Sequence, residues 1–170
     1  MGLFDKFKSK AKKQEASVDN NSKTILLAPM TGQAKNIDQC QDPVFAGEIV
    51  GKGTMIIPSQ GKLYSPVDGT ISMLAETGHA IGITAKSGVE ILIHIGLDTV
   101  ELDGKPFTLK ASKDQDIKAG DLLLEFDISQ IEEGGKLTES PVIITNPDGY
   151  DITVLKTGNV DHGDQLIEVK

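Results

Sequence analysis

The sequence predicts an all-β protein: an antiparallel sandwich or barrel built from a duplicated motif, with one or two short helical turns. The chain of 170 residues contains 18 glycines and seven prolines, and its valines and isoleucines fall in many short runs. Short apolar runs between glycine and proline turns are typical of antiparallel sheets. This length allows a sizeable core, so we expect one folded domain over residues 23–170, preceded by a flexible tail over residues 1–22.

Two internal repeats support this fold class. Residues 28–37, APMTGQAKNI, resemble residues 65–74, SPVDGTISML, and residues 117–127, IKAGDLLLEFD, resemble residues 160–170, VDHGDQLIEVK. The copies occur in the order first, first, second, second, which indicates two interleaved copies of one β motif. We therefore expect a compact sandwich or barrel with an approximate internal two-fold axis.

The remaining elements follow from turn and capping signals. Ser129 and Glu132 form a capping-box pattern, and Gly134 and Gly135 end it, which predicts one short helical turn. The apolar runs at 141–146 and 152–155 are predicted strands on either side of an NPDGY turn.

The tail is weakly amphipathic. Its first 14 residues, MGLFDKFKSKAKKQ, place Leu3, Phe4, Phe7 and Ala11 on one helical face among lysines. Two interpretations remain open, a weak contact with an anionic membrane and a solvated leader.

Charge and composition exclude several classes of function. The net charge is −8; residues 1–15 carry +3, which leaves −11 on the rest, so the body is acidic and nucleic acid is not an expected partner. Every basic residue is a lysine, and no GxxxxGK[ST] loop is present, so we expect any phosphate to be held covalently by a histidine. Cys40 is the single cysteine, and the chain has no signal peptide or apolar run of membrane-spanning length, which favours the cytoplasm.

Residues 76–102 contain two of the three histidines, His79 and His94. Alternating apolar residues predict two strands here, joined by a short polar hairpin loop. A symmetric loop centred between Lys86 and Ser87 pairs positions whose numbers sum to 173, which places His79 directly opposite His94, on the same face as Thr77. Their Cβ atoms would then be about 4.5–5.5 Å apart. A loop of odd length would shift the register and turn one histidine to the other face.

From the residues alone, this pair has three interpretations: partly buried structural histidines, a metal site, or a nucleophile with a supporting group. Neutral imidazole is a competent nucleophile, and a second imidazole can donate a hydrogen bond to phosphoryl oxygens. In the same register Gly96 faces Thr77 and would leave room for an approaching donor. Asp98 is interpreted either as a contact for a basic partner or as a solvated turn residue, and His162 as a turn residue.

Longer motifs identify a family. Residues 76–102 with their TxHAxxI and GVExLxHxGxDTVxL patterns, together with LFDKFK at 3–8, VFAGEIVGKG at 44–53 and SPVDGTI at 65–71, closely resemble the glucose-type enzyme IIA component of the bacterial phosphoenolpyruvate-dependent sugar phosphotransferase system. The resemblance covers nearly the whole chain. It implies an antiparallel β sandwich of duplicated motifs and a cytoplasmic phosphoryl relay.

The resemblance also implies roles for particular residues. His94 would accept a phosphoryl group from the phosphocarrier protein HPr, as a tele-phosphohistidine, and pass it to a cysteine on the IIB domain of a sugar permease. His79 would stabilise phosphorylated His94, and Thr77 would orient His79. The expected docking rim for partners comprises Val44, Phe45, Val50, Ile81, Leu92, Gly96 and Asp98. Many relatives carry phenylalanine where this chain has Ala75, Ile81, Leu92 and Ile95, so the choice of partner is open.

The same resemblance implies regulation. In enteric relatives the unphosphorylated component inhibits glycerol kinase and sugar permeases outside the phosphotransferase system, and the phosphorylated form stimulates adenylate cyclase. Relatives can also share a zinc ion between the two histidines and a carboxylate of a bound target. Two ligands make an incomplete zinc site, so we expect zinc at His79 and His94 only in a complex, and no intrinsic cofactor.

Two other classes are weighed against the relay. A zinc hydrolase of similar β fold would use His79 and His94 but needs a third ligand, and the sequence has no HxH or HExxH motif. A lipoyl or biotin carrier would need a lysine at a hairpin tip. Lys86 has that position but lacks a neighbouring methionine.

Overall fold

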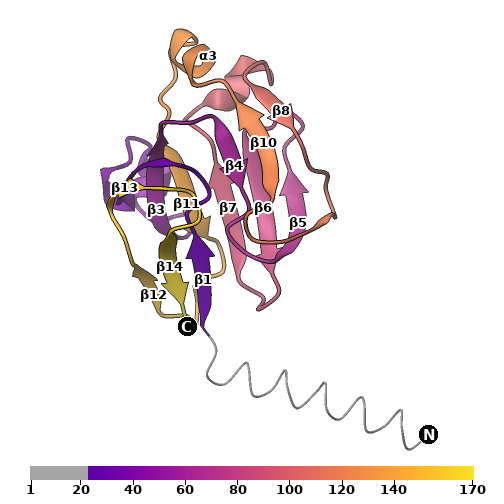
Figure 1. Ribbon diagram of the computed structural model, residues 1–170. Helices are drawn as coiled ribbons and strands as arrows, with labels where there is room; N and C mark the ends of the chain where they lie inside the picture. The colour runs from indigo at the N-terminus through magenta and orange to yellow at the C-terminus, as the bar shows by residue number, and fades with distance from the viewer. Residues whose placement is uncertain (1–22) are drawn as a thin grey trace, which may run out of the picture.

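The computed structural model describes residues 23–170, which form three antiparallel sheets (Figure 1). The largest has the order β13-β2-β3-β11-β7-β6-β5-β9, and the smaller two have the orders β1-β14-β12 and β4-β10-β8. The strands of the large sheet are β2 (Gly32–Asn36), β3 (Lys52–Pro58), β5 (Gly69–Leu74), β6 (Ala80–Ala85), β7 (Glu90–His94), β9 (Asp116–Ile117), β11 (Ser140–Ile144) and β13 (Gly158–Val160). Those of the small sheets are β1 (Thr24–Leu27), β4 (Lys62–Tyr64), β8 (Phe107–Leu109), β10 (Leu122–Phe126), β12 (Ile152–Val154) and β14 (Gln165–Val169).

Helical structure within residues 23–170 is limited to short pieces. They are α2 (Pro43–Ala46), α3 (Ile128–Glu133) and two 3₁₀ turns, η1 (Ile37–Gln39) and η2 (Thr99–Leu102). The predicted all-β class with short helical turns is confirmed, and α3 is the predicted one. Its cap lies earlier than the sequence indicated, because the carboxylate of Asp127 accepts the hydrogen bond from the backbone N–H of Gln130 at 3.1 Å.

The two repeats occupy equivalent places at opposite ends of the large sheet. Gly32 begins β2 and pairs with Val160 of β13, and Gly69 begins β5 and pairs with Ile117 of β9. These pairs join corresponding positions of the two repeats, so the predicted internal duplication is confirmed. The strand order is symmetric under the duplication. From one end β13, β2, β3 and β11 correspond to β9, β5, β6 and β7 from the other, and β11 pairs with β7 at the centre.

The turns of the repeats match as well. The N–H of Gly163 donates to the carbonyl of Ala28 at 3.0 Å, and the N–H of Gly120 donates to the carbonyl of Ser65 at 2.8 Å. Both glycines have positive φ, +94° and +91°, a conformation that costs glycine least. The small sheets extend the correspondence, because β14 and β10 are their central strands and carry the second repeat.

One main core joins all three sheets, and Figure 1 shows the two smaller sheets over one face of the larger one. It includes Leu26 of β1, Leu124 of β10 and Ile83 of β6, each fully buried. A second cluster packs α2 and η1 against β3 and β11 on the other face of the large sheet and comprises Ile37, Cys40, Phe45, Met55, Leu97 and Ile143. Cys40 is a buried packing residue there, and its burial raises the pKa of the thiol.

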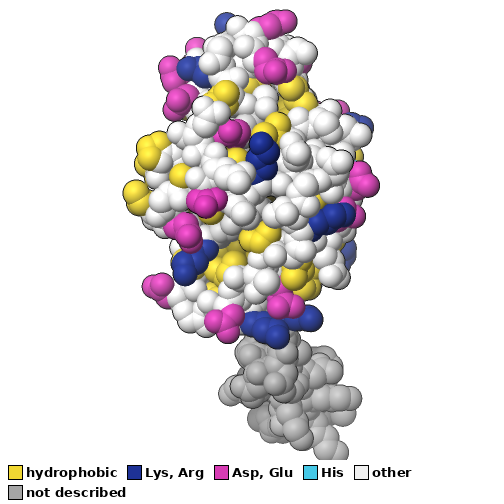
Figure 2. Space-filling model, turned by 90° about the vertical axis from the view of Figure 1, so that its left-hand side faces the viewer, with side chains coloured by type: hydrophobic (Ala, Val, Ile, Leu, Met, Phe, Trp, Pro, Cys, Tyr) yellow, Lys and Arg dark blue, Asp and Glu magenta, His cyan; other side chains and the backbone are white. Residues whose placement is uncertain are grey.

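Over residues 23–170 there is no helix long and apolar enough to cross a membrane. The predictions made for the tail, an amphipathic helix and a contact with anionic membrane, fall on residues 1–22, outside the described residues. On the face drawn in Figure 2, acidic and basic side chains are interspersed with patches of apolar ones.

The matching glycines allow a test of the duplication. In Gly32→Ala the new Cβ would lie 2.1 Å from the carbonyl oxygen of Ile57, and in Gly69→Ala 2.3 Å from that of Thr84. We expect each variant to lose about 2 kcal/mol or more of unfolding free energy in urea titrations, since backbone atoms must shift. Gly149→Ala is the control, with φ +84° but no atom within 4 Å, and should lose only about 1 kcal/mol. A smaller loss in either repeat variant than in the control would contradict this geometry.

Candidate functional site

The hairpin that carries both histidines has a different register from the predicted one. Its loop comprises residues 86–88, closed by hydrogen bonds from the N–H of Ala85 to the carbonyl of Val89 at 2.8 Å and from that of Gly88 to the carbonyl of Ala85 at 2.9 Å. Gly88 has φ +96°, as expected for the last residue of a three-residue loop. Paired positions therefore sum to 174, and His94 lies opposite Ala80. The predicted direct pairing of His79 with His94 is wrong by one residue.

The two imidazole rings nevertheless meet, with centroids 5.1 Å apart and planes inclined at 74°. His79 lies before β6, in the turn that follows Gly78 at φ +82°. Its carbonyl accepts a hydrogen bond from the N–H of Ile95 at 2.7 Å. Side chains alternate between the two faces along β6, which would direct residue 79 to the face opposite His94. Residue 79 lies before the regular strand, so this alternation does not apply to it.

His94 is the last residue of β7, and its ring is held by the backbone that follows. Nδ1 is 2.7 Å from the carbonyl oxygen of Gly96. A carbonyl can only accept, so Nδ1 carries the hydrogen, and Nε2 of the neutral ring keeps its lone pair.

Gly96 has a different function from the one predicted. Its φ is +73°, and a Cβ there would lie 2.5 Å from Cγ2 of Thr99 and 2.8 Å from the carbonyl oxygen of Leu137. The missing side chain therefore avoids a clash within the fold, and the prediction that it clears a path for a donor opposite Thr77 is wrong. This backbone turn is needed to bring the Gly96 carbonyl back to the ring of His94.

The buried hydroxyl of Ser140 holds this turn by hydrogen bonds. The N–H of Gly96 donates to Oγ of Ser140 at 3.1 Å, and Oγ of Ser140 donates to the carbonyl of Thr138 at 2.8 Å. Ser140 is fully buried. Sequence reasoning missed it, because it lies 44 residues from Gly96 and no local pattern marks it.

His79 has a hydroxyl partner. Oγ1 of Thr77 lies 2.5 Å from Nδ1 of His79. When this hydroxyl donates to Nδ1, the hydrogen of the neutral ring is on Nε2. The nitrogen left to face a ligand is then a donor.

The predicted docking rim is only partly at the surface. Val44 is 43 % exposed and Asp98 is exposed, whereas Val50 and Leu92 are partly buried. Ile81 is fully buried in the main core, so its assignment to the rim is wrong: it pairs with Ile93 on the inner face of the sheet.

Phe45 is also buried, at 7 % exposure, and its ring contacts that of His94 with centroids 5.4 Å apart. The sequence missed two exposed apolar residues nearby, Val100 at 50 % and Leu137 at 42 %. A cleft of about 440 Å³ beside the pair is lined by Asp42, Asp98 and Leu137, among others.

Burial keeps both histidines neutral. It lowers the pKa of His79, and the neighbouring His94 lowers it further. Burial also lowers the pKa of His94, although the Gly96 carbonyl and the carboxylates of Asp42 and Asp98 act in the opposite direction. At neutral pH the pair therefore presents a lone pair on Nε2 of His94 and, when Thr77 donates to His79, a neutral donor beside it.

Residues 23–170 contain no group of three or more histidine, cysteine, aspartate or glutamate side chains placed to hold a metal ion. His79 and His94 alone provide two ligands, fewer than the three that a catalytic zinc site requires. The alternative of a zinc hydrolase has no support from this geometry.

Comparisons with known proteins give the family. Residues 24–150 match the family model for the phosphoenolpyruvate-dependent sugar phosphotransferase system, EIIA 1. Glucose-specific EIIA components of Bacillus cereus and Bacillus anthracis are each 52 % identical over 128 residues, which is 75 % of this chain and 77 % of theirs. The solved glucose permease IIA of Mycoplasma capricolum superposes with a TM-score of 0.84 at 38 % identity, covering 87 % of this chain and 96 % of that one. The chain therefore belongs to the EIIA 1 family of the sugar phosphotransferase system, whose members are components of a phosphoryl-transfer relay.

Proposed function

We propose that this chain is a cytoplasmic phosphocarrier that accepts a phosphoryl group from phospho-HPr on Nε2 of His94 and passes it to the IIB domain of a glucose-type sugar permease. The observation that carries the proposal is the hydrogen bond from Nδ1 of His94 to the carbonyl of Gly96. It commits the ring to the tautomer whose lone pair is on Nε2.

The transfer uses the pair as follows. The Nε2 lone pair of His94 attacks the phosphorus as the bond to the donor's histidine nitrogen breaks, and the positive charge that develops on the His94 ring is stabilised by the Gly96 carbonyl. Nε2–H of His79 donates to a phosphoryl oxygen, with Thr77 holding its tautomer. The reverse sequence at His94 releases the group to the next acceptor.

Exposed apolar side chains near the pair support docking of partner proteins. Val44, Val100 and Leu137 are all at least 42 % exposed, and such residues are favourable at the centre of transient interfaces. We propose that HPr and the IIB domain use this surface in turn. Regulation of glycerol kinase, of permeases outside the system and of adenylate cyclase, and a zinc ion shared with a target, stay predictions.

The proposal is tested by incubation with labelled phosphoenolpyruvate, enzyme I and HPr. We expect one acid-labile phosphoryl group per chain on the parent protein and none on His94→Gln. His79→Gln should accept the group but pass it on more slowly, because the donor to the phosphoryl oxygens is lost. Full labelling of His94→Gln would show that another residue is the acceptor.

The pH dependence follows from the lowered pKa of His94. Protonated imidazole has no lone pair, so acceptance must fail below the folded-state pKa, which burial places under the usual value of about 6.5. We expect the initial rate with separately prepared phospho-HPr to stay level from pH 8 to 6.5 and to fall at lower pH. A rate already halved at pH 6.5 would be inconsistent with a lowered pKa at this nucleophile.

Thr77→Val removes the hydroxyl while keeping the side-chain shape. We expect onward transfer to slow about fivefold, since one hydrogen bond of roughly 1 kcal/mol no longer holds the His79 tautomer. Thr153→Val on the exposed strand β12 is the matched control and should transfer at the parent rate. Equal rates for both variants would remove Thr77 from the mechanism.

A further inference from the structure

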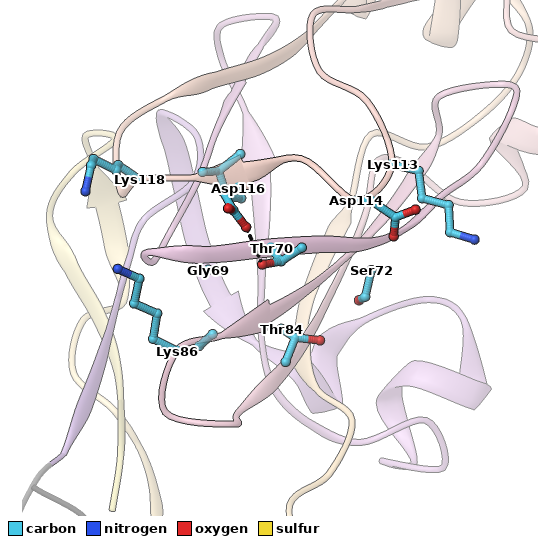
Figure 3. A pocket seen from close by; sticks show the side chains of 11 residues that line it. Gly69, Thr70, Ser72, Thr84, Lys86, Lys113, Asp114, Asp116 and Lys118 are labelled. Atoms are coloured by element: carbon cyan, nitrogen blue, oxygen red, sulfur yellow. Dashed lines mark hydrogen bonds between the residues drawn. The ribbon is translucent and has the colours of Figure 1, made fainter. Parts of the chain in front are cut away.

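A second concave surface lies at the other end of β6 from the histidines. It is a cleft of about 790 Å³ between the β5–β6 strands and the segment 113–118 (Figure 3). This volume is within the range of small-molecule sites, roughly 300–1,000 Å³. β6 extends from Ala80, next to His79, to Ala85 at the cleft, a span of about 17–20 Å. None of the residues that line the cleft belongs to the histidine site.

The floor of the cleft carries hydroxyl groups. Thr70 of β5 lies directly across from Thr84 of β6, and Ser72 follows two positions later on β5. The alternate residue Ile71 and its partner Ile83 point into the core. The hydroxyl-bearing face of these strands is therefore the one that borders the cleft, as Figure 3 shows.

The wall of the cleft carries charges of both signs. Lys86 and Lys118 lie at one end in Figure 3, and Asp114 lies at the other. Asp116 is between them and accepts a hydrogen bond from Oγ1 of Thr70 at 2.9 Å. Lys113 also borders the cleft.

The ammonium groups of these lysines make no direct ion pair within residues 23–170. Four ion pairs join lysines to carboxylates within residues 23–170, and none involves Lys86, Lys113 or Lys118. Lys86 and Lys118 are held at the same end by the backbone: the N–H of Lys86 donates to the carbonyl of Asp68 at 3.1 Å, and the N–H of Ala119 donates to Oδ1 of Asp68 at 2.8 Å. Two like charges so placed favour an anion between them.

The internal duplication shows that the fold does not require these lysines. In the other repeat the N–H of Ser59 donates to the carbonyl of Thr31, as Lys86 does to Asp68. The N–H of His162 likewise donates to Thr31, as Ala119 does to Asp68, so Asp161 occupies the position of Lys118. The equivalent pair is a serine and an aspartate, and only one half of the molecule carries the basic pair.

Positions on the floor differ in the same way. The partners Thr70 and Thr84 correspond to Gln33 and Ile57 of the other repeat, which are likewise paired. The hydroxyls and the two ammonium groups are therefore special to one end of a sheet whose backbone is the same at both ends.

We propose that this cleft binds a phosphorylated sugar. The phosphate lies between the ammonium groups of Lys86 and Lys118, which suit it as point charges. The sugar hydroxyls contact the carboxylate of Asp114 and the hydroxyls of Ser72 and Thr84, which accept and donate hydrogen bonds. Both ends of the ligand are needed, since bare phosphate uses only the lysines and bare sugar only the far end.

Binding is measured on the full chain by calorimetry and by backbone amide shifts, with glucose 6-phosphate, glucose and inorganic phosphate as probes. We expect glucose 6-phosphate to bind at least tenfold more tightly than either other probe and to shift the amides of Thr70, Thr84 and Lys118. The double variant K86Q/K118Q should lose at least tenfold in affinity. Lys62→Gln replaces an exposed lysine of β4, away from the cleft. It is the matched control and should bind as the parent does.

The sugar end has its own variant. Asp114 has φ +69°, a conformation that asparagine also tolerates, so Asp114→Asn removes the charge without straining the backbone. It should weaken glucose 6-phosphate severalfold and leave inorganic phosphate unchanged. His94→Gln should retain the binding, which separates this cleft from the phosphoryl-transfer site.

Three results would overturn the proposal. They are no saturable binding of glucose 6-phosphate, equal binding of glucose 6-phosphate and inorganic phosphate, and binding that persists in K86Q/K118Q. Phosphatidylglycerol vesicles test the other source of a phosphate ester. Lysine-dependent binding to vesicles without binding of glucose 6-phosphate would also refute the soluble ligand.

Discussion

The hydrogen bond from Nδ1 of His94 to the carbonyl of Gly96 is the constraint on which the proposed phosphoryl transfer depends. It fixes both the orientation of the ring and the nitrogen that carries the lone pair. The surrounding structure serves this bond: Gly96 supplies a backbone conformation that a side chain would obstruct, and the buried Ser140 holds the same turn. Phe45 packs against the ring from the side, and burial keeps the ring neutral.

Much of the architecture could be predicted from the sequence, because repeats and turn glycines are local signals. The histidine pair was predicted as well, but the register was not. The register depends on whether the loop has two, three or four residues, and Gly88, the single glycine of this hairpin loop, fits either an even or an odd loop. The support given by Ser140 depends on a contact between distant segments, which no periodicity encodes. Ile81 was misplaced because a one-residue change of register reverses the face of every side chain.

The duplication gives the molecule two similar halves with different side chains at corresponding positions. Ala80 lies opposite His94, and the corresponding Gly53 of the other half lies opposite Ile143, a fully buried core residue. The same central position of the sheet therefore holds the proposed nucleophile in one half and a packing residue in the other. At the ends of the sheet, Lys86 has Ser59 as its counterpart. A backbone repeated twice allowed side chains to diverge without a change of fold.

The two outermost strands of the large sheet are also its shortest, β9 with two residues and β13 with three. Long exposed edges act as templates for pairing with other chains, and shortening them is a known protection. Exposed apolar side chains such as Val44, Val100 and Leu137 add to the risk of self-association. The short edge strands β9 and β13 leave few unpaired backbone groups to which a strand of another copy could add. Contacts with other molecules must then be made by side chains rather than by the backbone of the sheet.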